Sequence, residues 1–422
     1  MTFTMTFTMR IATLAFVAVC GLLSAACQPA LVTSPPRAAS ADILIGSDMP
    51  TSGAQASATR PLEEAIHLAV DQHPVIGRFK LAYLPLDDAL LGAQLPQKGI
   101  QNVKRMIADP RVLGMVGPYN SDVAAAEIPV ANVAQLAMIS PSNSFICLTQ
   151  TLPVCPFQPD ALRPAGGNNY FRTAPPDPVE GRAMARYVAA HDNVRRAAAF
   201  TLNPDLGNPI IDSFAAELAR TGGQLVLREV LPAATTDFTE FLATARARGA
   251  QAIYAADPET VACKARAQIK GIFPNGAYFL GVDGVVLPAC VAEAEENADG
   301  MLGTVGDVDP TRSTDMAVTQ VLDAYRKAFP NTSEVAPYTF AAYDCARMLI
   351  DAIRRAVDAN GGRIPTRAQV VEAVAGSQFK GVTGTYGFDA NGDAISPLMS
   401  IYRVEKGQWV YLQQIDASPK QG

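Results

Sequence analysis

Two short polar turns in the first third of the chain carry residues that could hold a small anion. The turn GPYNS at 117–121 follows the apolar run 112–116, and the turn SPSNS at 140–144 follows the apolar run 136–139. An Ala-rich segment separates them, so the pattern predicts a βαβ unit whose turns meet at the carboxyl edge of a parallel sheet, where ligands bind. Ser121 stands at the predicted helix N-cap, where its hydroxyl and the free helix N–H groups would suit a carboxylate. The alternative is that Ser121 only caps the helix.

Three acidic positions elsewhere could also meet a ligand, and each has a simpler structural explanation. Asp283, in the segment GVDG, is expected either to contact a ligand or to close a turn. Asp257 directly precedes Pro258 and is either a ligand contact or a helix N-cap. The pair Asp87-Asp88 follows a predicted strand, where we expect a solvated turn or a hinge contact rather than catalysis.

The chain lacks the motifs of common metal centres and hydrolases. Its three histidines (His67, His73 and His191) are not spaced as metal ligands, and neither HExxH nor GxSxG occurs. A secreted hydrolase acting through Ser121 or Ser144 is a rival hypothesis, but every histidine falls on a predicted helix or its end, so a His base is missing. We therefore expect no metal, no cofactor and no catalytic residue.

Strand-like and helix-like segments alternate along most of the chain, with short polar turns between them. We expect strands at 43–46, 79–86, 112–116, 136–139, 196–201, 224–231, 252–255 and 277–280, and helices at 62–71, 100–107, 179–190, 210–220, 238–248 and 260–270. This alternation predicts an α/β fold of doubly wound layers around parallel sheets. The pattern pauses at 168–178 and restarts, which indicates two lobes of similar size.

The last third contains too few elements for a third domain and should complete the two existing sheets. We therefore predict two doubly wound parallel-sheet lobes joined by a multi-strand hinge. Residues 42–172 plus 305–382 are assigned to lobe 1, and residues 173–304 plus 383–415 to lobe 2. A hinge between two lobes makes a cleft that can close.

Composition places the chain among ordinary globular proteins. It has 422 residues, 49% of them hydrophobic and 18% charged, with a formal net charge of −6. Nothing in this balance is basic enough to indicate nucleic-acid binding.

The amino terminus has the build of an export signal. An apolar stretch, Ile11–Ala26, follows Arg10, and it is too short for a comfortable membrane span. We predict a signal peptide at 1–26 and a flexible Pro/Ser/Ala tether at 27–41. The small residues before Cys27 resemble a bacterial lipobox, which would make Cys27 a lipidated first residue; ordinary secretory cleavage nearby is the alternative.

Cysteine usage fits export. Cys147 and Cys155 flank a short Pro-containing loop, and Cys263 and Cys290 could be neighbours across one βαβ unit, so two disulfides are expected. Cys345 lies in an Ala-rich predicted helix and is expected to be a buried free thiol. A Cys-rich metal site is the rival hypothesis, but the spacings match no zinc motif.

Several motifs occur in an order and spacing that are typical of one family. They are GPYNS at 117–121, MISPSNS at 138–144, NYFRTAPPDPVEGRAMARYV at 169–188, LPLDDALL at 84–91, FLGVDGVV at 279–286, GMLGTVGD at 300–307 and FKGVTGTYGFDANGD at 379–393. Together they resemble the type I periplasmic binding proteins, in particular the Leu/Ile/Val-binding-protein-like receptors of ABC importers. The resemblance covers nearly all of residues 42–413.

The resemblance implies roles for four residues. In that family lobe 1 fixes the carboxylate and ammonium of an amino acid before lobe 2 closes. Ser121 would offer its hydroxyl and helix N-terminus to the carboxylate, and Ser142 a backbone carbonyl to the ammonium. Ser144 would serve both groups, and Asp283 would pair with the ammonium from lobe 2, where desolvation strengthens the attraction.

The chain departs from the family around the side-chain pocket. Leu206 stands where a Tyr is often found, residues 256–259 replace a common aromatic, and the loop 47–53 lacks the usual bulky apolar lid. We expect a pocket more polar or wider than one built for leucine, and we expect Trp409 to serve packing. The further candidate contacts are Asn120, Asn143, Asp257 and Leu206.

The resulting expectation is an extracytoplasmic solute-binding lipoprotein that captures an amino acid or a similar small zwitterion by closing two lobes. Its implied partners are the small ligand, an ABC permease with its ATPase, and the membrane through a lipid anchor. A sensory ligand-binding module for a signalling partner is the alternative within the same fold.

Overall fold

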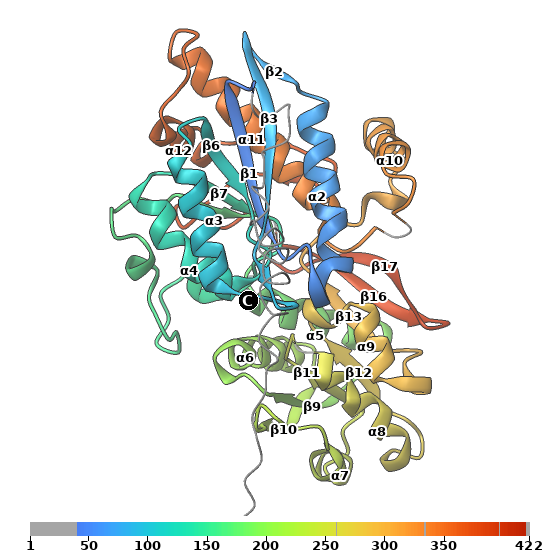
Figure 1. Cartoon of the computed structure of the whole chain (residues 1–422). Coiled ribbons are helices and arrows are strands. Elements are labelled where there is room, and N and C mark those ends of the chain that lie inside the picture. The colour runs from blue at the N-terminus through green and yellow to red at the C-terminus, as the bar shows by residue number, and fades with distance from the viewer. Residues whose placement is uncertain (1–39, 259, 333–334, 396, 419–422) are drawn as a thin grey trace, which may run out of the picture.

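The computed structural model describes residues 40–258, 260–332, 335–395 and 397–418. The predicted signal peptide, Cys27 and nearly all of the tether lie outside the described residues. Two α/β lobes lie end to end, and one edge of each sheet is turned toward the other lobe (Figure 1). In the part of the chain that the structure describes, we find no helix with the length and apolar character required to cross a membrane.

Lobe 1 is built on a six-stranded sheet in the order β2-β3-β1-β6-β7-β8. Its strands are β1 (Ile43–Met49), β2 (Val75–Ile76), β3 (Phe79–Asp87), β6 (Val112–Val116), β7 (Ala137–Ser140) and β8 (Tyr170–Arg172). All neighbours pair in parallel except β2 with β3. Strands β1, β6 and β7 are buried throughout, as expected for parallel strands covered on both faces.

Helices cover both faces of this sheet. One face carries α2 (Ala56–Asp71), α10 (Met316–Ala328), α11 (Thr339–Ala359) and α12 (Arg367–Ala375), and the other carries α3 (Pro96–Ala108) and α4 (Ser121–Val133). Two small hairpins, β4 (Ala89–Leu90) with β5 (Ala93–Gln94) and β14 (Phe379–Lys380) with β15 (Thr385–Tyr386), lie outside the main sheet.

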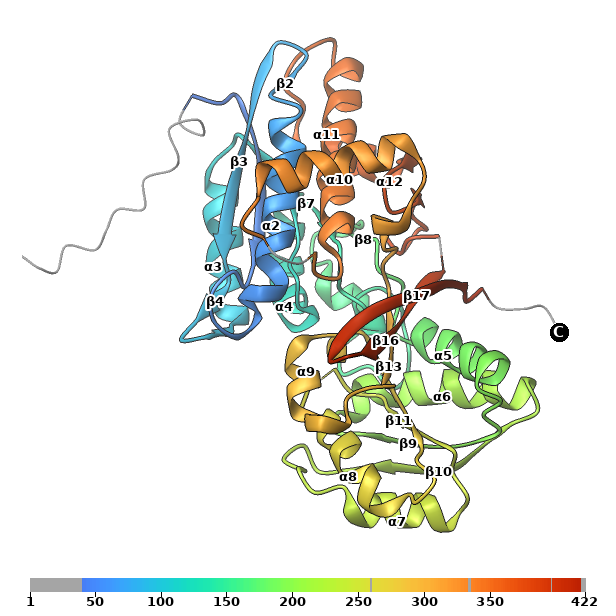
Figure 2. The ribbon, with the colours of Figure 1, turned by 90° about the vertical axis from the view of Figure 1, so that its right-hand side faces the viewer.

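Lobe 2 is built on a seven-stranded sheet in the order β10-β9-β11-β12-β13-β16-β17. Its strands are β9 (Arg196–Thr201), β10 (Gln224–Val230), β11 (Ala252–Ala255), β12 (Tyr278–Gly281), β13 (Leu302–Val305), β16 (Leu398–Glu405) and β17 (Gln408–Asp416). Its helices are α5 (Pro178–His191) and α6 (Pro204–Arg220) on one face, and α7 (Thr239–Ala247), α8 (Lys264–Ile272) and α9 (Pro288–Glu293) on the other. The antiparallel hairpin β16–β17 joins the parallel strands at β13 and forms the edge visible in Figure 2. The predicted fold class is confirmed.

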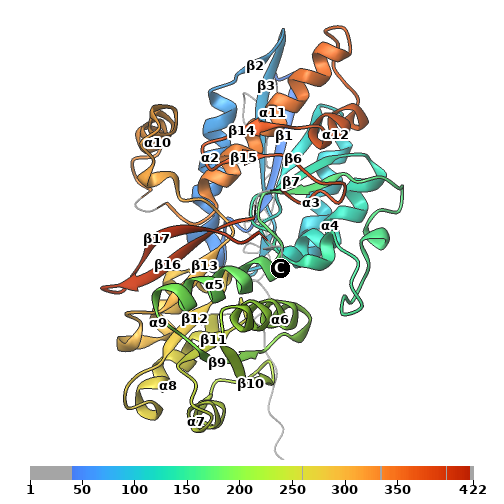
Figure 3. The ribbon, with the colours of Figure 1, turned by 180° about the vertical axis from the view of Figure 1, so that it is seen from behind.

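The chain crosses between the lobes three times, at 173–177, 306–315 and 389–397. Tyr386 and Phe388 pack in the core of lobe 1, and Figure 3 shows β14 and β15 beside α11. The last crossing therefore follows residue 388, and the predicted boundary at residue 383 is too early, because the segment after it still supplies apolar side chains to lobe 1.

One buried ion pair ties the first crossing to the last. Arg172 is fully buried, and its Nε donates to Asp393 Oδ1 at 2.7 Å. The same guanidinium donates to the carbonyl of Phe145 at 2.9 Å and to the hydroxyl of Thr149 at 2.6 Å. Burial alone would raise the pKa of Asp393, but the charge of Arg172 lowers it below its usual value. This pair therefore holds the second polar turn next to the hinge.

Both expected disulfides are present. Cys147 bonds to Cys155 with a Cα–Cα distance of 5.5 Å, and Cys263 bonds to Cys290 with a Cα–Cα distance of 5.4 Å. Cys345 is a buried free thiol on α11, as expected.

Three carboxyl groups are buried together at the carboxyl edge of the lobe 1 sheet. Asp48, Asp88 and Glu127 are each 0% exposed, and burial is the main cause that raises the pKa of each. The expectation of a solvated turn is therefore wrong for Asp88, because the side chain is fully enclosed in lobe 1. Asp87 is half-buried, and its carboxylate accepts the N–H of Thr51 at 3.1 Å.

Candidate ligand-binding site

The two polar turns of lobe 1 lie side by side, as the βαβ prediction required. Strands β6 and β7 pair in parallel, so the turns leave the sheet at the same edge. The hydroxyl of Ser140 donates to the carbonyl of Pro118 at 2.8 Å. The hydroxyl of Ser142 and the amide of Asn143 both donate to the carbonyl of Tyr119, each at 2.8 Å. The second turn therefore holds the first in place.

Gly117 allows the first turn to approach β1. Its φ of +115° lies in a region that favours glycine, and a Cβ there would stand 2.6 Å from the carbonyl oxygen of Asp48. Only glycine fits this close approach, so the turn is seated directly on the neighbouring strand.

Helix α4 begins at Ser121 itself, so the predicted N-cap was wrong by one residue. Asn120 holds the N-cap position with an extended backbone, its side chain makes no capping bond, and its Oδ1 is buried without a protein partner. Ser121 is half-buried, and its Oγ accepts the N–H of Phe145 at 3.3 Å. The carboxylate of Asp122 accepts the N–H of Val123 at 2.9 Å and so satisfies part of the helix end.

Ser144 connects the second polar turn to the first crossing between the lobes, residues 173–177. Its carbonyl accepts the N–H of Asp177 at 2.8 Å. Burial raises the pKa of Asp177 to about 7, and a hydrogen bond from Ser144 limits the rise. Oδ2 of Asp177 is buried and has no protein partner, so this carboxyl group is available to an incoming donor.

Asp283 contacts lobe 1 across the cleft. It opens a short 3-10 helix, Asp283–Val285, directly after β12. Its Oδ2 accepts the hydroxyl proton of Tyr338 at 2.7 Å, and Tyr338 stands immediately before α11 with a φ of +67°. The same Tyr338 oxygen accepts the N–H of Gly306 at 3.2 Å. Burial raises the pKa of Asp283, and the Tyr338 hydrogen bond opposes the rise.

Glu180 and Tyr254 complete the lobe 2 side, and sequence reasoning missed both. Glu180 is 2% exposed, and its Oε2 accepts the N–H of Asp283 at 2.8 Å and the hydroxyl of Thr304 at 2.7 Å. Burial and then the charges of Asp283 and Asp177 raise the pKa of Glu180. The Tyr254 hydroxyl is buried without a protein partner near these acids. The run PPDPVEG at 175–181 already contained two acids at a lobe crossing, which was the available signal.

The remaining candidates have mainly structural surroundings. Asn143 is fully buried, and its Oδ1 accepts the Tyr170 hydroxyl at 2.9 Å. Asp257 is fully buried, and its Oδ2 accepts the N–H groups of Leu202 at 2.8 Å and Asn203 at 3.1 Å. Leu206 packs half-buried against the core under α6. Asn143 and Asp257 thus shape the turns on either side of the cleft.

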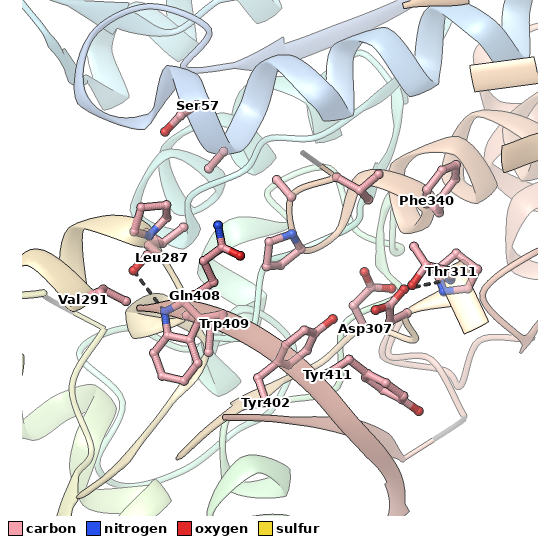
Figure 4. A pocket seen from close by; sticks show the side chains of 18 of the residues that line it. Ser57, Leu287, Val291, Asp307, Thr311, Phe340, Tyr402, Gln408, Trp409 and Tyr411 are labelled. Carbon is pink, nitrogen blue, oxygen red and sulfur yellow. Dashed lines mark hydrogen bonds between the residues drawn. The ribbon is translucent and has the colours of Figure 1, made fainter. Parts of the chain in front are cut away.

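A cavity of about 580 Å³ adjoins this site on the side of the β16–β17 hairpin. Its walls come from the start of α2, from the segment 286–291 of lobe 2, from the crossing 307–311, and from 335–340 (Figure 4). Trp409 lines this cavity, and its indole N–H donates to the carbonyl of Leu287 at 3.1 Å. Its side chain therefore forms a cavity wall in addition to packing.

Comparisons with known proteins agree with this architecture. A family model described as "Periplasmic binding protein" matches residues 42–408. The "Leu/Ile/Val-binding protein homolog 2" of Brucella abortus is 25% identical, over 89% of this chain and 94% of the relative. The solved leucine-binding protein LivK of Thermotoga maritima superposes with a TM-score of 0.72 at 22% identity, over 89% of this chain and 99% of that one.

A solute-binding protein of Rhodopseudomonas palustris, solved with p-hydroxybenzoic acid, has a TM-score of 0.70 at 19% identity, over 89% of this chain and 98% of that one. All three are named as binding proteins for small solutes. With a family model spanning nearly all of both lobes, the chain belongs to the periplasmic binding protein family.

Proposed function

We propose that this protein captures an amino acid or a related small zwitterion in the cleft and passes it to an ABC permease driven by a separate ATPase. The observation that carries the proposal is the arrangement of opposite charges across the cleft. Lobe 1 offers the start of α4 at Ser121, which suits a carboxylate, and lobe 2 offers Asp283, which suits an ammonium group.

The relatives support a solute of this class. The names of the Brucella and Thermotoga proteins specify branched-chain amino acids or leucine, and the Rhodopseudomonas protein was solved with an aromatic carboxylate. A carboxylate is common to all of these solutes. Ser121, Ser142 and Ser144 would bind the carboxylate and ammonium groups, with Asn120 beside them.

Closure of the lobes would follow from differential binding. A solute that touches both lobes only in the closed form stabilises that form by the difference in its affinity for the two states. The Tyr338–Asp283 hydrogen bond already spans the lobes in this structure. An ammonium group at Asp283 would share the carboxylate with Tyr338 and so add its charge to an existing contact.

Isothermal titration and thermal unfolding with a panel of amino acids and short carboxylates test the proposal. A ligand at a hundred times its Kd should stabilise the protein by about 2.7 kcal/mol. Ser121→Ala should weaken the best ligand roughly tenfold, and Asp283→Asn roughly thirtyfold, because the first loses a hydrogen bond and the second a buried charge pair. Glu240→Gln, an exposed position on α7, is the matched control. Unchanged affinity in both cleft variants would refute the assigned site.

We further propose that Cys27 carries a lipid and holds the protein at the outer face of a membrane. The support is the row of small residues before Cys27 and the polar tether that follows it. Fractionation of cells that express Cys27→Ser should move the protein from the membrane fraction to the soluble fraction. An unchanged distribution would favour ordinary secretory cleavage.

A further inference from the structure

Neither Asp283 nor Tyr338 lines the cavity, but residues close to both in the sequence do. Val286 lies three residues after Asp283, and Pro337 directly precedes Tyr338; both line the cavity. A solute whose ammonium group pairs with Asp283 would therefore have this cavity next to its remaining atoms.

The cavity is much larger than a branched aliphatic side chain requires. Its volume of about 580 Å³ falls within the roughly 300–1,000 Å³ of pockets that enclose drug-sized ligands. The small side chains of Ser57 and Ala58 form its wall at the start of α2, and Figure 4 shows Ser57 across the cavity from Tyr402 and Trp409. Because the loop 47–53 before α2 lacks a bulky apolar lid, the cavity remains open on this side.

Aromatic rings and carboxylates line this space together. Tyr402, Tyr411, Trp409 and Phe340 supply the rings, and Tyr402 and Tyr411 meet edge to face at 5.8 Å (Figure 4). Asp307 accepts the N–H groups of Val308 and Tyr338, each at 2.7 Å, which fixes its carboxylate. Asp309 accepts the N–H of Thr311 at 2.8 Å. None of the described residues that line the cavity is Lys, Arg or His.

The segments around the cleft are acidic in the sequence. Eight segments contain or follow the carboxyl ends of parallel strands at the facing edges of the two sheets: 47–52, 117–122, 140–145, 173–180, 201–207, 255–258, 281–287 and 304–311. They contain no Lys, Arg or His, and their acids are Asp48, Asp122, Asp177, Glu180, Asp205, Asp257, Asp283, Asp307 and Asp309. Asp48 and Asp257 are fully buried, and the other acids favour a solute of positive charge where they are ionised.

We infer that the cavity takes the side chain of the bound solute and that this side chain carries a positive charge. The inference rests on the proposed function and names its substrate class: a basic amino acid or a close analogue, larger than leucine. Tyrosine and tryptophan faces attract cations, most strongly where water is excluded, and Asp309 supplies the counter-charge. The α-carboxylate and α-ammonium groups would keep the places assigned to them at Ser121 and Asp283.

A matched pair of ligands tests this inference. L-arginine and L-citrulline have nearly the same shape and differ by the side-chain charge, and L-leucine represents the branched aliphatic class. Titration calorimetry on the purified full chain should find arginine at least roughly tenfold tighter than both citrulline and leucine. In Asp309→Asn the preference for arginine over citrulline should fall at least roughly threefold, whereas Glu240→Gln should leave it unchanged.

The results distinguish the cationic side chain of the solute from the proposed capture of an amino acid. Equal affinity for arginine and citrulline, or tightest binding of leucine, would overturn the cationic side chain and leave amino-acid capture intact. Binding of none of the three amino acids while another member of the panel binds would also overturn the cationic side chain. Binding of no member of the panel, or binding that Ser121→Ala leaves unchanged, would overturn the proposed function itself. Tyr411→Leu provides a second variant that should also reduce the preference for arginine; a preference unchanged in both variants would place the side chain elsewhere.

Discussion

The buried carboxyl group of Asp88 should make the stability of lobe 1 fall as pH rises. Asp88 is 0% exposed, and neither of its carboxylate oxygens has a protein hydrogen-bond partner. Burial and then the charge of Asp48 raise the pKa of Asp88 to about 8. Glu127 lies in the same group with a pKa raised to about 8, mainly by burial. The folded protein therefore keeps protons on these groups at neutral pH that the unfolded chain releases.

The size of the effect follows from proton linkage. An aspartate in the unfolded chain has a pKa of about 3.9, so between about pH 4 and pH 8 the folded state binds one more proton at Asp88 than the unfolded state. Its contribution to stability is complete below about pH 4 and declines by up to about 1.4 kcal/mol per pH unit as the pH rises. Between about pH 5 and pH 7.5, this one group should remove about 3 kcal/mol from the free energy of unfolding.

Asp88→Asn removes that titration while conserving the shape of the side chain. Urea unfolding at about pH 5 and pH 7.5 should show that the variant loses about 3 kcal/mol less stability than the wild type between the two conditions. Asp358→Asn, an exposed change on α11 of the same lobe, is the control and should follow the wild type. Parallel pH profiles for Asp88→Asn and the wild type would refute the reasoning, because they would show that Asp88 ionises without cost in the folded state.

Two further predictions concern the covalent and ionic ties of the fold. Arg172→Met leaves the Asp393 carboxylate buried with only the neutral side-chain donors Gln150 and Thr149. It should lower the free energy of unfolding by about 3–5 kcal/mol in urea titrations; a loss below about 1 kcal/mol would contradict the role of the pair. Because the charge of Arg172 lowers the Asp393 pKa, its stabilising effect should persist at neutral pH and disappear as the pH falls below about 4. The disulfide between Cys263 and Cys290 closes a separation of 27 residues, and the one between Cys147 and Cys155 a separation of 8. By chain entropy, replacing both cysteines of the longer loop by Ala should lower the free energy of unfolding by about 1 kcal/mol more than the same change in the shorter loop. Calorimetry of the two double variants measures both losses, and a larger loss for the shorter loop would contradict this reasoning.

The elements and their edges could be predicted because the relevant signals are local. The apolar runs before each polar turn, and the Ala-rich segment between them, are enough to specify strand, turn and helix. A parallel pair then brings the two turns together, as the hydrogen bond from Ser140 to Pro118 shows. The disulfide between Cys147 and Cys155 was equally accessible, because only 8 positions separate the two residues.

The predictions for Asp88 and for the lobe boundary were wrong for the same reason: the burial of a residue depends on how the whole lobe packs. Asp87 and Asp88 are adjacent residues of the same type, yet only the second is completely buried in the folded lobe. The boundary at residue 383 was placed by a change of pattern, whereas the packing of Phe388 against lobe 1 depends on a surface far away in sequence.

The sequence by itself determined the two lobes, the polar turns of lobe 1 and the edge of the sheet at which these turns meet. Only the tertiary structure decided which distant groups meet within a lobe, at the hinge and across the cleft. Asp283 reaches Tyr338 over 55 positions, Glu180 reaches Thr304 over 124, and Arg172 reaches Asp393 over 221. Strand and turn patterns act over a few residues, but contacts at these separations depend on how complete helices and sheets pack. The acidic residues near the cleft could therefore be read from the sequence, whereas their positions relative to one another depend on the tertiary structure.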